Sequence, residues 1–425
     1  MDVAHGKRSK IKIKIRSIIF WLYGFCKKGM GQIKRDWHSG VIRKILMYPS
    51  FRTESDLSDI LNRVLWGFPF KKNLEISVML ENSNILRNID NIGTPKYQRR
   101  YLNENRNHIK FIKESESLSE FDKIIIWNKH YAMLPKILSH IEKLEIADKN
   151  FFSISESNIW KKSYYNTFTG AEKISFNENS RKNFRSLIKN TTNKKKGYCF
   201  LTGPSFNEYK KYEFETDSIK VICNTIVINN EFLEYINGLD VIAFADPVFH
   251  FSSCEYAALF REHVLKVVEK YSCYVIVPEE TVPLLITHYP LLKDYLIGIG
   301  LIGSLNFPTQ NNLTVKGAAS IVTYLMTPLL SSLCNEIYFL GADGREKSEN
   351  YFWKHNKSVQ LTEEMESVFN THPSFFRDRI YEDSYNEHCE YFEKLLEYGE
   401  KQDKKYYSLT KSFIPALAKR SISFG

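Results

Sequence analysis

The sequence predicts an α/β protein: a Rossmann-like parallel sheet with helices on both faces, preceded by a smaller mixed or helical N-terminal region. Short apolar, β-branched runs recur after residue 197, and long amphipathic segments separate them. Buried strands that alternate with helices are typical of βαβ units and therefore of a parallel sheet. Of the 425 residues, 43% are hydrophobic, which is enough for a sizeable core. The predicted strands are 198–202, 219–223, 240–245, 273–277 and 336–340.

Three amphipathic segments in the same half of the chain predict helices, at 252–271, 314–333 and 382–400. Pro328 lies inside the second segment, where a proline is expected to kink or divide a helix. The sequence shows no internal repeat.

The chain divides into three predicted parts: a basic arm over 1–48, an N-terminal region over 49–190 and the Rossmann-like domain over 195–425. In the N-terminal region, 121–128 is expected to form a strand and 133–144 a helix, which predicts a small α/β or a mostly helical unit. The polar and basic stretch 177–197 marks the boundary between the last two parts.

The net charge of +10 is confined to one end of the chain. Residues 1–44 contain twelve Lys or Arg and two Asp, so the remainder is neutral. An enzyme of nucleic acids is expected to carry basic residues around its groove, and no nucleic-acid partner is predicted here. Basic residues flank apolar ones over 7–44, which favours contact with an anionic membrane surface, the alternative being a solvated tail.

The predicted location is the cytoplasm, peripheral on the inner face of the cell membrane. The uncharged stretch Ser17–Cys26 is about half the roughly 20 residues that span a bilayer. No small-residue cleavage site follows it, so it does not read as a secretory signal. The seven cysteines are scattered and form no metal-ligand spacing, which fits a reducing compartment and predicts neither disulfides nor a zinc site.

The motif "TGPS" follows the first predicted strand of the C-terminal half. Ligands of open parallel sheets bind at the carboxyl ends of the strands, and Gly203 allows the backbone to approach a ligand closely. Pro204 suits a first helical position. Ser205 adds a hydroxyl where free N–H groups favour an anion. These residues predict a phosphate site, the alternative being an ordinary tight turn.

Missing motifs narrow the class of phosphate ligand. The turn after this strand is not a G-x-G-x-x-G, and no G-K-[ST] follows it, so the turn has neither a dinucleotide fingerprint nor a P-loop. The second strand ends in Asn224, whose amide both donates and accepts hydrogen bonds. An amide suits a nucleotide base or a sugar hydroxyl, so the site is predicted to bind a mononucleotide or a nucleotide-sugar.

Polar residues also follow the later strands. Asp246 comes directly after the third strand and is either a catalytic carboxylate or a helix N-cap. Two further groups complete the predicted rim of the site. The segment Thr314, Lys316 and Gly317 is expected to begin a helix, and Gly341 and Asp343 follow the last clear strand.

Two loops downstream contain histidines among aromatic residues. Histidine is the usual proton carrier near neutral pH, so His372 is a candidate acid or base, although a loop histidine is often only structural. His355 and Asn356, in "YFWKHN", are candidates for binding the substrate.

The order of these motifs resembles that of bacterial CMP-sialic-acid-type sialyltransferases. The shared features are the strand with Gly-Pro-Ser, "CN" after the second strand, a polar residue plus Pro after the third, the expected Thr-x-x-Gly helix start, "LGADG" and a downstream loop His. "FADPVFHF" and "HPSFF…HC" look closer to the bacterial β-Kdo transferases, which use CMP-Kdo. The resemblance covers about 197–417, and its specificity comes from the shared order of weak motifs.

The resemblance implies a metal-independent glycosyltransferase that moves an acidic sugar from a CMP-activated donor to a surface glycan or glycolipid. The CMP-sugar would be a co-substrate, and no cofactor is expected. Asp246 would be the nucleophile or charge stabiliser and His372 the general acid or base. The implied nucleotide-binding residues are Gly203, Pro204, Ser205, Asn224, Thr314, Lys316, Gly317, Gly341 and Asp343.

The sequence departs from the sialyltransferase pattern at Thr202, where a second Gly is common, and at Asp246, where those enzymes have Asn. The carboxylate would allow a covalent glycosyl adduct and hence retention. Retention and inversion both stay open, as do the donor sugar and the acceptor. Two rival classes are an archaeal-type pterin pyrophosphokinase, which needs Mg²⁺ and ATP, and a membrane-associated scaffold that binds no nucleotide.

Overall fold

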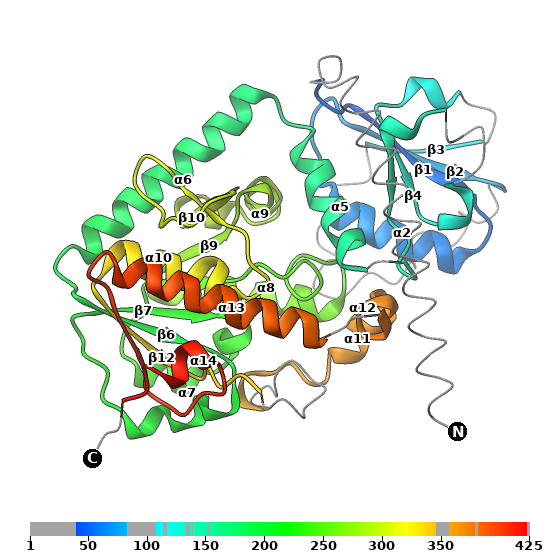
Figure 1. Ribbon diagram of the computed structural model, residues 1–425. Coiled ribbons are helices and arrows are strands. Elements are labelled where there is room, and N and C mark those ends of the chain that lie inside the picture. Colours follow the sequence, from blue (N-terminus) through cyan, green and yellow to red (C-terminus); the bar gives the residue numbers. More distant parts are fainter. Residues whose placement is uncertain are drawn as a thin grey trace, which may run out of the picture.

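Two parallel sheets, each with its own helices, form the molecule (Figure 1). The computed structural model describes residues 40–82, 108–113, 117–132, 137, 139–151, 153–345, 357–378 and 381–422. Residues 1–39 of the predicted basic arm lie outside this range, as do His355 and Asn356. The arm as predicted reached residue 48, but the first strand already begins at Lys44.

The smaller sheet belongs to the N-terminal region and has the order β3-β2-β1-β4-β5 with every neighbouring pair parallel. The sequence revealed only one of its strands, the run at 121–128. The strands are β1 (Lys44–Phe51), β2 (Glu75–Leu80), β3 (Ile109–Ile112), β4 (Lys123–Ile126) and β5 (Leu144–Ile146), and helix α2 (Glu54–Gly67) follows β1. The prediction of a helix over 133–144 is wrong for the end of that range, where a turn and a short 3-10 segment lead into β5.

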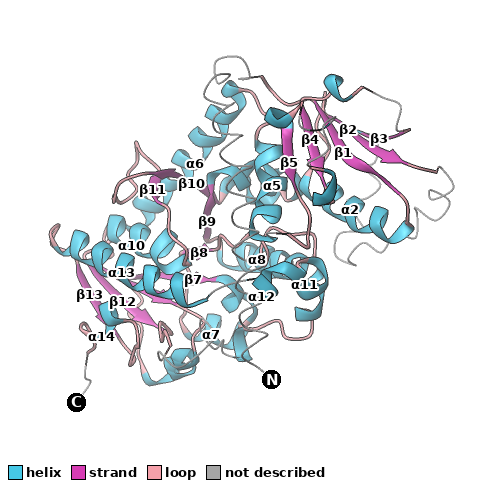
Figure 2. Cartoon of the chain, turned by 45° about the vertical axis from the view of Figure 1, so that its right-hand side comes forward, coloured by secondary structure: helices cyan, strands magenta, loops and turns pink. Residues whose placement is uncertain are grey.

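The larger sheet has the order β11-β10-β9-β8-β7-β6-β12-β13, again with all neighbours parallel. Helices cover both of its faces, so the predicted Rossmann-like fold is confirmed (Figure 2). All five predicted strands are present. The strands are β6 (Lys196–Phe200), β7 (Ser218–Cys223), β8 (Val241–Ala243), β9 (Tyr274–Pro278), β10 (Leu296–Ile302), β11 (Thr314–Lys316), β12 (Glu336–Leu340) and β13 (Lys405–Ser408).

Two of the three predicted helices of the larger domain are confirmed, as α8 (Glu255–Tyr271) and α13 (Tyr381–Glu400). The prediction for 314–333 is wrong at its start. Residues 314–316 form strand β11, so the helix does not begin there. A π-helical turn at Val322–Met326 precedes α10, and Pro328 near the start of α10 divides the segment as expected. The helices are α7 (Asn230–Tyr235), α8 (Glu255–Tyr271), α9 (Val282–His288), α10 (Thr327–Leu333), α11 (Met365–Thr371), α12 (Pro373–Asp378), α13 (Tyr381–Glu400) and α14 (Pro415–Ala418).

Two helices, α5 (Ser153–Tyr165) and α6 (Gly170–Thr191), connect the sheets. Most of the stretch 177–197, predicted to be a boundary, is therefore the second half of a 22-residue helix. A capping box between Thr169 and Glu172 begins α6 and satisfies backbone N–H groups at its start. The helix then packs on the larger sheet, where Asn183 Nδ2 donates to the Leu296 carbonyl at 2.8 Å.

A buried carboxylate fixes α5 between the two sheets. Glu156 is 0% exposed and receives hydrogen bonds from Arg63 of α2 and from Trp160 Nε1, the latter at 2.6 Å. Its other oxygen lies 3.0 Å from Nδ1 of His372, between α11 and α12. The Glu156 cluster thus joins a helix of the small sheet, the connecting helix and the C-terminal helices.

Opposing effects set the protonation of Glu156. Burial alone would raise its pKa, but the charges of Arg63 and His372 and the hydrogen bonds that Glu156 accepts outweigh burial and hold the pKa at about 2. Glu156 is therefore ionised at neutral pH, and its negative charge is compensated within the cluster.

A second contact holds α2 against the larger domain. Trp66 Nε1 donates to the Phe251 carbonyl at 2.6 Å, and the guanidinium of Arg261 lies 3.6 Å from the centre of the Trp66 ring. On the indole, the His288 ring stacks with a centroid distance of 4.3 Å. The relative position of the two sheets is thus fixed by buried polar and aromatic contacts.

Replacing Glu156 by Gln should lower the free energy of unfolding by about 3–5 kcal/mol, because it leaves the buried Arg63 without its counter-charge. The measurement is urea unfolding at pH 7. As a control, Lys182→Gln removes an exposed pair with Asp294 and should cost less than about 1 kcal/mol. Equal effects of the two variants would contradict a structural role for the cluster.

The cost of Glu156→Gln should also depend on pH. The folded-state pKa of about 2 lies below the ordinary value of 4.5, so the stabilisation from Glu156 is present above pH 4.5 and is lost as the pH falls toward 2. The stability difference between wild type and variant should therefore shrink over that interval. A constant difference, measured by urea unfolding at several pH values, would contradict this account.

Candidate functional site

Each sheet has a point at which the order of its strands reverses. In the small sheet this point lies between β1 and β4, and in the large sheet between β6 and β12. Ligands of open parallel sheets bind in the crevice outside such a point. A cavity is found at each: one of about 630 Å³ in the small sheet and one of about 50 Å³ in the large sheet.

The cavity of the large sheet brings together four of the predicted nucleotide-binding residues. Gly203, Asn224, Gly341 and Asp343 all line it, from the ends of β6, β7 and β12. Side chains from α13 and from the segment before α14 cover the opposite side. The remaining lining residues are Leu201, Thr202, Cys223, Ser320, Ile321, Val322, Ala342, Gly344, Tyr385, His388 and Ile414.

The Gly-Pro-Ser turn is occupied by a carboxylate of the chain itself. Ser205 N–H lies 3.2 Å from both carboxylate oxygens of Asp343, and Gly203 N–H donates to the Gly341 carbonyl at 3.0 Å. The Ser205 hydroxyl lies 2.9 Å from the hydroxyl of Thr410. These donors already have partners, which corrects the prediction that Gly203, Pro204 and Ser205 form a bare phosphate site.

The absence of a side chain at residue 203 is explained by the same carboxylate. A Cβ there would lie 2.1 Å from Asp343 Oδ2 and 2.5 Å from the Gly341 carbonyl oxygen. Burial raises the pKa of Asp343, although the hydrogen bonds from Ser205 oppose the rise. Gly203 therefore leaves room for Asp343, and the turn and the β12 loop form one unit.

Asn224 is one polar residue of this cavity with unused hydrogen-bonding capacity. Its backbone is left-handed, with φ of 49°, at the start of the 3-10 turn Asn224–Ile228. Its Oδ1 is buried and has no hydrogen-bond partner among the described residues. A buried amide oxygen without a partner costs free energy, which a ligand that donates a hydrogen bond would recover.

Three predicted nucleotide-binding residues lie elsewhere. Thr314 and Lys316 belong to β11, at the edge of the sheet farthest from β12, and Gly317 follows them. The ammonium group of Lys316 sits 5.4 Å from the centre of the Tyr391 ring. None of the three lines either cavity, so the structure does not bring them to Gly203 and Asn224; the expected helix start is wrong, because the segment is an edge strand.

Asp246 caps the turn that follows β8. Its Oδ1 accepts hydrogen bonds from the N–H groups of Val248 and Phe249 at 2.7 and 2.9 Å. This is the capping role that was one of the two predicted for Asp246. Its own N–H donates to Nδ1 of His250 at 2.9 Å, so this buried imidazole carries its proton on Nε2. Burial lowers the pKa of His250 to about 4, which keeps it neutral. The carboxylate of Asp246 is held in one orientation.

A cluster of charged side chains beside Asp246 was not predicted from the sequence. Lys161 of α5 is 4% exposed, and its Nζ lies 3.0 Å from Glu280 Oε1, directly after β9. Burial lowers the pKa of Lys161, whereas the charges of Glu280 and, more weakly, Asp246 raise it. Tyr165 donates to Glu279 at 2.6 Å. The pair of glutamates in "VPEETVP", after a predicted strand, was the available signal.

His372 does not reach a cavity. It is 1% exposed and lies against Glu156 and Ser157, both on α5, and its Nε2 has no partner among the described residues. His372 lines neither of the two cavities, so the structure does not bring it to Asn224 or Asp343 as an acid or base. Its contacts make it part of the Glu156 cluster, which positions α5 and thereby Lys161.

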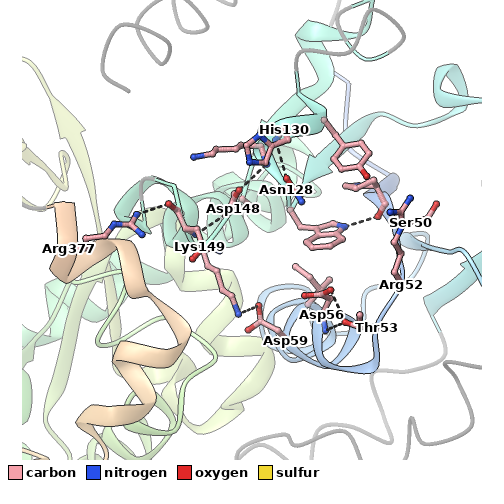
Figure 3. A pocket seen from close by; sticks show the side chains of 17 residues that line it. Ser50, Arg52, Thr53, Asp56, Asp59, Asn128, His130, Asp148, Lys149 and Arg377 are labelled. Carbon is pink, nitrogen blue, oxygen red and sulfur yellow. Dashed lines mark hydrogen bonds and ion pairs between the residues drawn. The ribbon is translucent and has the colours of Figure 1, made fainter. Parts of the chain in front are cut away.

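The cavity of the small sheet is much larger and was not anticipated from the sequence. Its walls come from the loops after β1, β4 and β5, from the start of α2 and from Arg377 of α12 (Figure 3). Its lining residues are Pro49, Ser50, Arg52, Thr53, Asp56, Asp59, Ile60, Trp127, Asn128, Lys129, His130, Tyr131, Ala147, Asp148, Lys149, Asn150 and Arg377.

Comparison of the chain with protein-family models, with curated proteins and with solved structures finds no match. Within the described part of the chain, no helix is both long and apolar enough to cross a membrane. The described residues also contain no group of three His, Cys, Asp or Glu side chains placed to hold a metal ion. The function is therefore inferred from the geometry of the two sheet edges.

Gly203→Ala should destabilise the protein by about 1–3 kcal/mol, because the new Cβ overlaps Asp343 and the Gly341 carbonyl. Thermal and urea unfolding measure the change. Gly170→Ala is the matched control, since nothing lies within 4 Å of its added Cβ and it stands at the start of α6. A Gly203→Ala variant as stable as the control would contradict the described contact.

Proposed function

We propose that the chain is a glycosyltransferase that moves an acidic sugar, of the Kdo or sialic acid type, from a CMP-activated donor to a surface glycan or glycolipid. One observation carries the proposal: the unpartnered amide oxygen of Asn224 lies at the switch point of the larger sheet. The carboxylate of Asp246, after the neighbouring strand β8, lies at the same sheet edge.

The nucleotide binds in the cavity between the ends of β6, β7 and β12. Asn224 Oδ1 accepts a hydrogen bond from the cytosine amino group or from a ribose hydroxyl. The carboxylate of Asp343 suits a ribose hydroxyl better than a phosphate, since two anions would repel one another. Small-molecule sites usually measure about 300–1,000 Å³, so binding requires Tyr385, His388 and Ile414 to move away from the 50 Å³ cavity.

The reaction takes place beside β8 and β9. The bond between the anomeric carbon and the phosphate oxygen breaks, and its electron pair leaves with CMP. Asp246 either attacks the anomeric carbon or stabilises the positive charge that develops on it, which correspond to retention and inversion. Lys161, held by Glu280 at 3.0 Å, stabilises the departing phosphate.

The acceptor hydroxyl then bonds to the anomeric carbon and loses its proton to a base at the same sheet edge; in the covalent route this step breaks the bond to Asp246 and frees its carboxylate. Glu280 is suited to this step because its side chain is 30% exposed, whereas His372 is buried against Glu156. His372 is a positioning residue, since it holds the helix that carries Lys161. Residues 7–44 keep the enzyme at an anionic membrane surface, where a glycolipid acceptor is found.

Asp246→Asn should reduce release of CMP from CMP-Kdo or CMP-sialic acid by about 10²–10³-fold and leave CMP affinity unchanged. The amide oxygen of Asn can still accept the N–H groups of Val248 and Phe249, so the turn should be retained. Measurements are CMP release and calorimetric binding of CMP. Unaltered turnover would remove Asp246 from the reaction.

Asn224→Gly should weaken CMP binding by about tenfold or more, since a ligand hydrogen bond to the amide is lost. Glycine accepts the left-handed backbone at this position without strain. Asn237→Gly is the matched control, because Asn237 has a similar φ of 45° and lines neither cavity. If CMP, UDP, GDP and ATP all fail to bind to the wild type, the nucleotide assignment is wrong.

A requirement for Mg²⁺ separates this proposal from its rival. CMP release should persist in EDTA, because Lys161 and backbone dipoles, rather than a metal, are proposed to offset the phosphate charge. ATP-dependent formation of a diphosphate that stops in EDTA would instead establish the pyrophosphokinase class.

A further inference from the structure

The cavity of the small sheet is separate from the proposed reaction site. It opens at the switch point between β1 and β4, and none of its lining residues is shared with the cavity of the larger sheet. At about 630 Å³ it already has the size of a small-molecule site, without any rearrangement. Its location and volume therefore indicate that it binds a ligand of its own.

The carboxylates of this cavity are already engaged by the protein. Asp148 accepts the N–H groups of Lys129 and Asn150 at 2.9 and 2.8 Å, and Asp59 pairs with Arg63 and Lys149. Asp56 accepts the hydroxyl of Thr53, at the start of α2 (Figure 3). These hydrogen bonds and ion pairs hold the loops and the helix start in place.

Donors in the same cavity remain available. Arg52 pairs through Nε with Glu81 at 2.8 Å, and its side chain is 68% exposed, so the guanidinium stays accessible to a ligand. The ammonium group of Lys129 makes no ion pair within the described chain and lies 4.7 Å from the centre of the Phe151 ring. Cationic side chains that line the cavity favour a ligand that carries negative charge.

An aromatic wall accompanies these donors. Trp127 stacks on Phe51 with a centroid distance of 4.6 Å and an interplanar angle of 13°, and its Nε1 donates to the Pro49 carbonyl at 2.7 Å. The indole is therefore fixed in orientation while it lines the cavity. A rigid aromatic face of this kind binds the flat or apolar face of a ring.

We propose that this cavity is a binding site for a phosphate ester of a ring compound, either a nucleotide or a sugar phosphate. The phosphate lies between Arg52 and Lys129, and the ring lies against Trp127. Arg377 of α12 also lines the cavity and donates to the Asn150 carbonyl at 2.8 Å. A ligand in the cavity would therefore lie beside α12, the helix that follows His372. This site does not depend on the proposed glycosyl transfer.

The experiment is calorimetric titration of the full chain with glucose 1-phosphate, CMP, inorganic pyrophosphate and methyl glucoside. The Asn224→Gly variant serves as the background, because it weakens the proposed nucleotide site of the larger sheet. We expect glucose 1-phosphate or CMP to bind and methyl glucoside not to bind. The first two ligands distinguish a sugar phosphate from a nucleotide.

Lys129→Gln and Arg52→Gln should each weaken this binding by about ten- to a hundredfold, the usual loss for a hydrogen bond to a charged group. Lys110→Gln is the control, because Lys110 belongs to the same sheet, is 61% exposed and lies outside the cavity. Three results would overturn the proposal: no phosphate ester binds, pyrophosphate binds while both ring compounds fail, or the cavity variants match the control. Loss of CMP binding in Asn224→Gly with retained glucose 1-phosphate binding would separate the two sites.

Discussion

A single buried carboxylate, Glu156, determines how the parts of this molecule fit together. It receives a hydrogen bond from Arg63 of the small domain and contacts His372 of the C-terminal helices. A charge without exposure is tolerated only when it is paired and hydrogen-bonded, so the three elements must stay together for the cluster to be stable. The orientation of α5, and with it the position of everything that α5 carries, follows from this constraint.

The same helix carries Lys161 to the edge of the larger sheet. Glu156 and Lys161 lie five residues apart, yet one pairs with the small domain and the other with Glu280 after β9. Each sheet also has a cavity at its own switch point. The chain therefore has two sheet edges that each carry a cavity. Helix α5 lies between the two sheets and makes contacts with both.

The strands of the larger sheet could be read from the sequence because they are short apolar runs buried on both faces. Three strands of that sheet escaped detection: β10 is interrupted by glycines, β11 has three residues, and β13 is a polar edge strand. In the small sheet only β4 was recognised. A long polar segment separates β2 from β3, and β3 and β5 have only four and three residues, so no regular alternation of strands and helices shows in the sequence.

The sequence by itself determined which residues follow the strands, and Gly203, Asn224 and Asp343 do meet at one edge as a parallel sheet requires. Only the tertiary structure decided what these residues contact. Asp343 fills the turn of Ser205 from 138 positions away, and His372 meets Glu156 across 216 positions. Local patterns report backbone geometry, whereas the partner of a buried polar group depends on how distant segments pack, which no short motif encodes.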